Sequence, residues 1–250
     1  MVINDLKLFF AISMFAVIII AGWYPFKNRQ KKGHLDFPIG ETLATGVFLG
    51  AAMLHLLPEA DNMLRKMNYN YPFAYVITGL TFLLFLWFEH LGKELYQKEN
   101  NNHPAFAMLA WIMLSIHSFV LATALGFSEN YSIAIMLFLA IITHKWAESF
   151  AISVQLNKSS MTHKTNLLLF ISFALMTPLG IFVGMNIENE VKTNSLIDPV
   201  LISISAGTFL YLGTLHGLER CVMVKRCCNL KYFSFVIIGF ILMAAVAIYT

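Results

Sequence analysis

Eight apolar stretches recur along the 250-residue chain, and each is long enough to cross a lipid bilayer as a helix. A transmembrane helix needs about 20 predominantly apolar residues. The stretches cover residues 7–25, 38–58, 73–92, 105–127, 131–155, 166–186, 198–218 and 232–249. Charged residues make up 12% of the chain, against about 25% in a soluble globular domain. We therefore predict an all-α, polytopic membrane bundle of eight transmembrane helices, with residues 1–250 forming a single transmembrane domain.

The basic residues alternate between the two sides of this predicted bundle. The segments that follow the first, third, fifth and seventh stretches hold twelve Lys and Arg, whereas the opposite side holds four. Because Lys and Arg are enriched in cytoplasmic loops, both termini are predicted to be extracellular or lumenal. The net charge is only +3, and the aromatic residues lie inside the apolar stretches. We therefore expect the lipid bilayer, and no nucleic acid, among the partners.

Two of the stretches carry similar sequences. The second contains GVFLGAAMLH (46–55) and the seventh contains GTFLYLGTLH (207–216), which agree at five of ten positions. The charge pattern makes these two helices run in opposite directions, as in the inverted repeats of many transporters. A chance match between two apolar helices is the alternative.

Ionisable side chains lie near the middle of two consecutive stretches. The fourth carries His117, and the fifth carries His144, Lys145 and Glu148. Such groups are costly in a bilayer and therefore mark functional sites. His144 and Glu148 are four residues apart and share one helix face. Imidazole and carboxylate are ligands that suit Zn²⁺, so we predict a metal site between the fourth and fifth helices.

Simpler explanations exist for several of these residues. A histidine inside a membrane can simply form hydrogen bonds between helices, and Lys145 can simply neutralise Glu148. His55 and His216, the last residues of the two similar segments, are candidate entrance and exit residues or ordinary polar groups near the membrane surface. Glu89 is expected to lie at that surface.

At these residues the sequence resembles the ZIP family of zinc and iron transporters. The matching motifs are GVFLGAAMLHLLPEA (46–60), FEHLGKEL (88–95), HSFVLATALG (117–126), HKWAESFAISVQL (144–156), TPLGIFVG (177–184) and SAGTFLY (205–211). The resemblance implies a bundle of three, two and three helices, and metal uptake toward the cytosol. The His–Lys pair and the short third inner loop look closest to the animal plasma-membrane branch, which implies a plasma-membrane location.

The resemblance also implies roles for single residues. The metal ligands of the family match His117, His144 and Glu148. Three further residues match positions that form a second metal site in two-metal members of the family. They are Ser118, Lys145 and Thr177. A lysine ammonium at that site implies a single ion, because a fixed positive charge disfavours a second divalent ion.

Two positions depart from the family pattern. An acidic residue is usual where this chain has Leu121, and another where it has His216. We expect a transporter of divalent metal ions, of Zn²⁺ before Fe²⁺ or Mn²⁺, which is not an enzyme and has no cofactor beyond the transported ion. A homodimer is a further expectation. The alternatives are a ZIP-like protein with a regulatory or partner-binding role, or an intramembrane zinc-dependent hydrolase of lipids.

Overall fold

The computed structural model describes residues 3–27, 37–96, 104–128, 130–186, 196–215, 217–218 and 229–248. Within these ranges, eight helices are long and apolar enough to cross a membrane, which confirms the predicted fold class. The elements are α1 (Ile3–Lys27), α2 (Pro38–Gly50), η1 (Ala51–Leu56), α3 (Leu57–Lys66), α4 (Phe73–Tyr96), α5 (Pro104–Phe127), α6 (Tyr131–Lys158), α7 (His163–Asn186), α9 (Ile197–Tyr211) and α10 (Leu230–Ala247).

The second span is longer than its sequence pattern predicted. The helix was expected over residues 38–58 but continues without a break through η1 and α3 to Lys66. Its last part is amphipathic: Ala60, Asp61 and Leu64 are buried, whereas Arg65 and Lys66 are exposed. Hydropathy therefore could not reveal it, because only one face of α3 is covered by protein.

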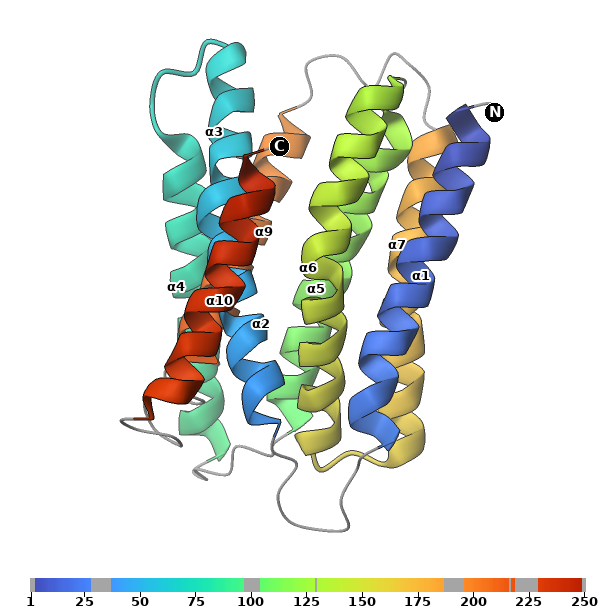
Figure 1. Ribbon diagram of the computed structural model, residues 1–250. Helices are drawn as coiled ribbons and strands as arrows, with labels where there is room; N and C mark the ends of the chain where they lie inside the picture. The colour runs from blue at the N-terminus through green and yellow to red at the C-terminus, as the bar shows by residue number, and fades with distance from the viewer. Residues whose placement is uncertain are drawn as a thin grey trace.

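The start of α1 and the end of α10 lie at the same end of the bundle, where α3 also ends (Figure 1). We call this the termini end, and the opposite end, where α1 ends and α2 begins, the far end. The bundle is divided into two groups of four spans by their contacts. The site group contains α1, α5, α6 and α7, and the outer group contains α2 with η1 and α3, α4, α9 and α10.

The contacts between spans follow the order expected of an inverted repeat. In the outer group, α2 packs on α10 and α4 packs on α9; in the site group, α1 packs on α6 and α5 packs on α7. An inverted repeat would relate α1 to α7, α2 to α9, α4 to α10 and α5 to α6. Under this exchange the contact of α2 with α10 becomes that of α9 with α4, and the contact of α1 with α6 becomes that of α7 with α5. Contacts of this symmetry favour the repeat over a chance match between two apolar helices.

The two similar segments also match in local structure. Gly46 and Gly207 begin these segments, and each lies against the backbone of a neighbouring helix. A Cβ on Gly46 would lie 2.0 Å from the carbonyl oxygen of Val236, and one on Gly207 would lie 2.6 Å from that of Thr78. Five residues beyond each glycine, at Ala51 and at Leu212, the helix widens into a π-helical segment. Such segments are frequent at functional sites.

Hydrogen bonds from side chains to backbone carbonyls join the helices within each group. In the site group, Ser149 donates to the carbonyl of Ile18 over 2.5 Å and Ser153 to that of Gly22 over 2.6 Å. In the outer group, Thr78 donates to the carbonyl of Ser203 over 3.0 Å. Each group is therefore held together by polar contacts as well as by packing.

Glu89 corrects one expectation from the sequence. Instead of lying at the membrane surface, its side chain is 3% exposed and accepts a hydrogen bond of 2.7 Å from the hydroxyl of Tyr211. The sequence suggested a surface position because Glu89 lies near the end of an apolar stretch. The contact between α4 and α9 covers it instead.

Candidate metal centre

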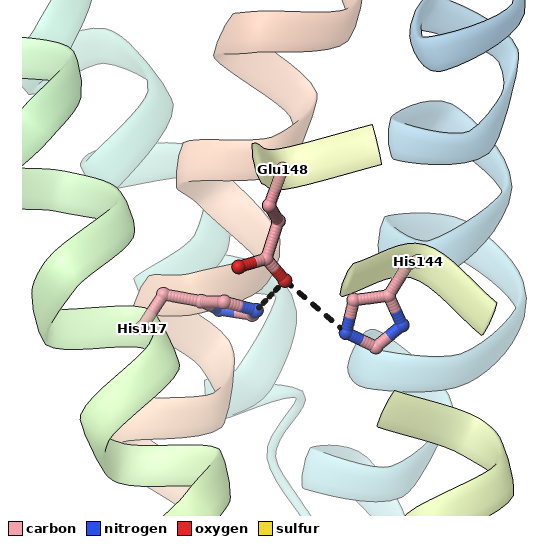
Figure 2. Close-up of side chains that lie close together, drawn as sticks. All are labelled: His117, His144 and Glu148. Atoms are coloured by element: carbon pink, nitrogen blue, oxygen red, sulfur yellow. Dashed lines mark ion pairs between the residues drawn. The ribbon is translucent and has the colours of Figure 1, made fainter. Parts of the chain in front are cut away.

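Three buried side chains converge between α5 and α6. His117 comes from α5, whereas His144 and Glu148 come from successive turns of α6 (Figure 2). The Oε1 atom of Glu148 lies 3.4 Å from Nε2 of His117 and 3.5 Å from Nε2 of His144. None of the three side chains is more than 1% exposed. The structure thus brings together the three residues that the sequence singled out.

The spacing of these atoms is close to that of a zinc site. Ligands at about 2.1 Å from a tetrahedral Zn²⁺ lie about 3.4 Å from one another. One ligand atom from each of His117, His144 and Glu148 can be chosen so that all three lie within 4.8 Å of one another. Small side-chain rotations would therefore bring the set onto an ion.

The hydrogen bonding of the three residues is incomplete among the described parts of the chain. Both ring nitrogens of His117 and of His144, together with Oε1 of Glu148, are buried and have no hydrogen-bond partner there. A buried polar atom without a partner costs about 1–3 kcal/mol, so five such atoms in one cluster are unusual. A divalent cation would satisfy three of them at once.

The second carboxylate oxygen of Glu148 is held by two neighbours. Its Oε2 atom accepts hydrogen bonds from Ser118 over 2.9 Å and from Lys145 over 2.8 Å. Lys145 also donates to the Ser118 hydroxyl over 2.9 Å. The sequence left open whether Lys145 neutralises Glu148, and the structure shows this ion pair, fully buried. It turns Oε1 toward the two imidazoles.

Thr177, the third of the proposed second-site positions, lies in α7. Its hydroxyl is buried and has no hydrogen-bond partner among the described residues. The structure therefore connects Ser118 and Lys145 to Glu148 and gives no such hydrogen bond to Thr177.

Phe209 forms an aromatic wall beside the two histidines, and the sequence analysis did not identify it. Its ring centroid lies 4.2 Å from that of His117 and 5.7 Å from that of His144. It also lies 5.0 Å from the ring centroid of Phe48. Phe48 and Phe209 occupy the same position of the two similar segments, so the repeat itself held the signal.

His55 connects the site to the termini end. Its ring centroid is 6.4 Å from that of His144, and its Nε2 lies 3.7 Å from a carboxylate oxygen of Glu59. Both residues line two cavities of about 470 Å³ and 360 Å³. Leu121 and Asp198 line the smaller one. We call these two cavities together the vestibule.

Glu59 and Asp198 were not predicted from the sequence as residues of the vestibule. Glu59 follows His55 by four residues, the same spacing that separates Glu148 from His144, and this spacing was the available signal. Asp198 had none, because only the packing of α9 brings it to the vestibule. His216, the candidate exit residue, lies outside the described residues.

The similarity to known proteins extends over most of the chain. The family model described as "ZIP Zinc transporter" matches residues 4–107 and 101–247. The mouse protein named Zinc transporter ZIP2 is 26% identical over 283 aligned positions, which cover 92% of this chain and 91% of the mouse protein. The human protein of the same name is 24% identical, with 91% and 90% covered. Zinc transporter ZIP1 of Danio rerio is 33% identical over 57% of this chain and 48% of its own length.

Proposed function

This chain belongs to the ZIP zinc transporter family, and we propose that it moves a divalent metal ion, Zn²⁺ before Fe²⁺ or Mn²⁺, across the membrane between α5 and α6. The observation that carries the proposal is the buried cluster of His117, His144 and Glu148, whose unpaired nitrogen and oxygen atoms face one another. Transport is the activity named for the family, and the alternative of a lipid hydrolase is set aside for that reason.

The ion enters from the termini end. The carboxylates of Glu59 and Asp198 line the vestibule and attract a cation, and His55 stands between the vestibule and His144. From there the ion passes to His117, His144 and Glu148 and leaves past the far end, where the sequence places His216. Neutral histidine suits such a passage because it is a good but exchangeable ligand for borderline ions.

The charges at the site favour weak binding of a single ion. Lys145 cancels the charge of Glu148, so the cluster of ion and ligands keeps the full charge of the ion. A cluster that carries two uncompensated charges in a low-dielectric interior binds its ion weakly. Weak binding is what rapid release at the far end requires.

Orientation and location complete the proposal. The termini end faces outward and the ion moves toward the cytosol, as the twelve-to-four distribution of Lys and Arg indicates. The acidic lining of the vestibule is in keeping with an outer face that collects cations. The plasma membrane and a homodimer stay predictions from the sequence.

The test is uptake of radioactive zinc by cells that express the chain, with His144→Ala and Glu148→Ala compared at equal amounts on the cell surface. Both changes should reduce uptake to the background of untransfected cells. His90→Ala is the matched control, because His90 is exposed on α4 and bonds only to a carbonyl of its own helix among the contacts described. Unchanged uptake in both site variants would remove the proposed site.

A regulatory or partner-binding role is the alternative that one observation favours. Leu121 lines the vestibule at the position where the family pattern has an acidic residue, and Lys145 already neutralises Glu148. Wild-type protein that reaches the cell surface but takes up none of zinc, iron and manganese would support this role.

A further inference from the structure

An ion pair connects the two groups of helices at the far end. Glu41 lies in the first turn of α2, in the outer group, and Lys158 lies in the last turn of α6, in the site group. Their carboxylate and ammonium groups are in direct contact, with side-chain exposures of 8% and 20%. The mechanism described so far uses neither residue.

The pair borders a small cavity beyond the metal centre. This cavity has a volume of about 80 Å³ and lies among α2, α5, α6 and the π-helical segment that follows α9. Besides Glu41 and Lys158, its lining includes Thr45, Phe48, Leu114 and Phe150. Phe48 in turn packs on Phe209, the wall of the metal centre. The cavity and the ion pair therefore lie on the far-end side of the metal centre, the direction in which the ion is proposed to leave.

The described cavities at the two ends of the bundle differ in volume. The vestibule cavities at the termini end measure about 470 Å³ and 360 Å³, whereas the cavity at the far end measures about 80 Å³. Among the described residues, the larger cavities thus lie at the termini end and the smaller one at the far end. In an alternating-access transporter, something has to hold the closed end shut while the other end is open.

Each charge of the pair also has a favourable place of its own. A carboxylate in the first turn of a helix and an ammonium group in the last turn both interact well with the helix dipole. Lys158 can in addition extend its ammonium group to water at the membrane surface. When the pair separates, each charge therefore still has a favourable interaction and neither is left unpaired in an apolar interior. The contact can for this reason be broken and formed again.

We propose that the Glu41–Lys158 ion pair is a latch that keeps the far end closed, and that the Glu41 carboxylate, once released, is a ligand that the departing ion meets there. This inference rests on the proposed function for the identity of the ion. Opening of the latch separates the two groups at the far end, joins the 80 Å³ cavity to the aqueous phase and exposes Glu41 to the ion.

The latch is tested by the reactivity of a cysteine in the far-end cavity. Thr45→Cys places a thiol there, in a protein whose Cys221, Cys227 and Cys228 are replaced by serine. In lipid nanodiscs both faces are accessible, so the rate of labelling by a small thiol reagent reports the opening of the far end whatever the orientation in cells. Glu41→Gln and Lys158→Gln should each raise this rate roughly tenfold or more, because each removes the ion pair.

Two controls make the result specific. The charge swap that combines Glu41→Lys with Lys158→Glu should bring the labelling rate back toward that of the parent protein, in which Glu41 and Lys158 are unchanged. Arg65→Gln breaks a part-buried ion pair with Asp61 within α3, at the opposite end of the bundle, and should leave the rate unchanged. Single variants that label no faster than the parent, or a swap that labels as fast as the single variants, would overturn the latch.

The ligand role of Glu41 is read from zinc uptake. Lys158→Gln opens the latch and keeps the carboxylate, whereas Glu41→Gln opens the latch and removes it. Uptake should therefore be lower in Glu41→Gln than in Lys158→Gln at the same labelling rate, and equal uptake would contradict the role. The labelling assay needs no transported ion, so a failed latch is distinguishable from a failed transport proposal, which His144→Ala tests separately.

Discussion

The ammonium group of Lys145 lies 2.8 Å from Oε2 of Glu148, less than one turn along the same helix, with both side chains fully buried. The pair places an ammonium group beside the proposed metal ligands. It orients the carboxylate, since Oε2 is engaged and Oε1 is left to face His117 and His144. It also lowers the negative charge that an incoming ion meets. One residue thus contributes to both the geometry and the strength of the site.

Removal of this charge should make the site bind its ion more tightly. In Lys145→Met, a bound ion meets the full negative charge of the Glu148 carboxylate, so we expect the KM for zinc uptake to fall by roughly tenfold or more. The maximal rate should fall as well, because a more tightly bound ion leaves more slowly. Lys145→Arg preserves the charge and should change KM by only a few-fold. A KM that is unchanged or higher in Lys145→Met would contradict the role of the ion pair.

A carboxylate in the vestibule should assist the capture of the ion. Leu121 is 5% exposed, lies one turn from His117 on α5 and lines the cavity of about 360 Å³. Leu121→Glu adds a negative charge there, and we expect the KM for zinc to fall by roughly three- to tenfold. Leu121→Gln has a similar shape without the charge and serves as the control. If both variants behave alike in concentration-dependent uptake, charge is not the cause.

The two glycines of the repeat should be intolerant of a methyl group. A Cβ would lie 2.0 Å from the carbonyl oxygen of Val236 in Gly46→Ala and 2.6 Å from that of Thr78 in Gly207→Ala. Either helix pair would have to separate, at a cost of about 1–3 kcal/mol. Gly79→Ala is the matched control, since a Cβ there meets nothing within 4 Å. Thermal unfolding in detergent should show a lower Tm for the first two variants and an unchanged or slightly higher one for the third.

Tyr211 should stabilise the contact between α4 and α9. Tyr211→Phe removes the hydrogen bond to the Glu89 carboxylate, and bonds to charged groups contribute about 1.5–3 kcal/mol. We therefore expect a lower Tm in Tyr211→Phe, whereas Tyr75→Phe, at an exposed position on the same α4, should be neutral. In a double-mutant cycle, Tyr211→Phe and Glu89→Gln should be less than additive. Full additivity would show that the two side chains do not act together.

Some contacts in the metal centre follow from the sequence of one helix, whereas others depend on how two helices pack. The partnership of His144 with Glu148 follows from the helical period alone, because residues four apart share a face. The partnership of His117 with Glu148 does not, because it depends on the relative depth and rotation of α5 and α6. The same holds for Ser118, whose hydroxyl reaches Oε2 of Glu148 from the other helix. Asp198 was missed because its place in the vestibule arises only from packing between spans, whereas Phe209 and Glu59 had a signal in the sequence, in the repeat and in the spacing from His55.

The eight membrane-spanning helices and the ionisable groups at mid-span follow from the order of residues, because the cost of placing a residue in lipid depends mainly on that residue and its neighbours in the chain. Which of these groups meet depends on the packing of the helices. This packing buries Glu89 under α9, turns Oε1 of Glu148 toward two imidazoles, and joins Glu41 to Lys158 across 117 residues of sequence. Such contacts depend on how whole helices pack against one another, and no local pattern of residues specifies that arrangement.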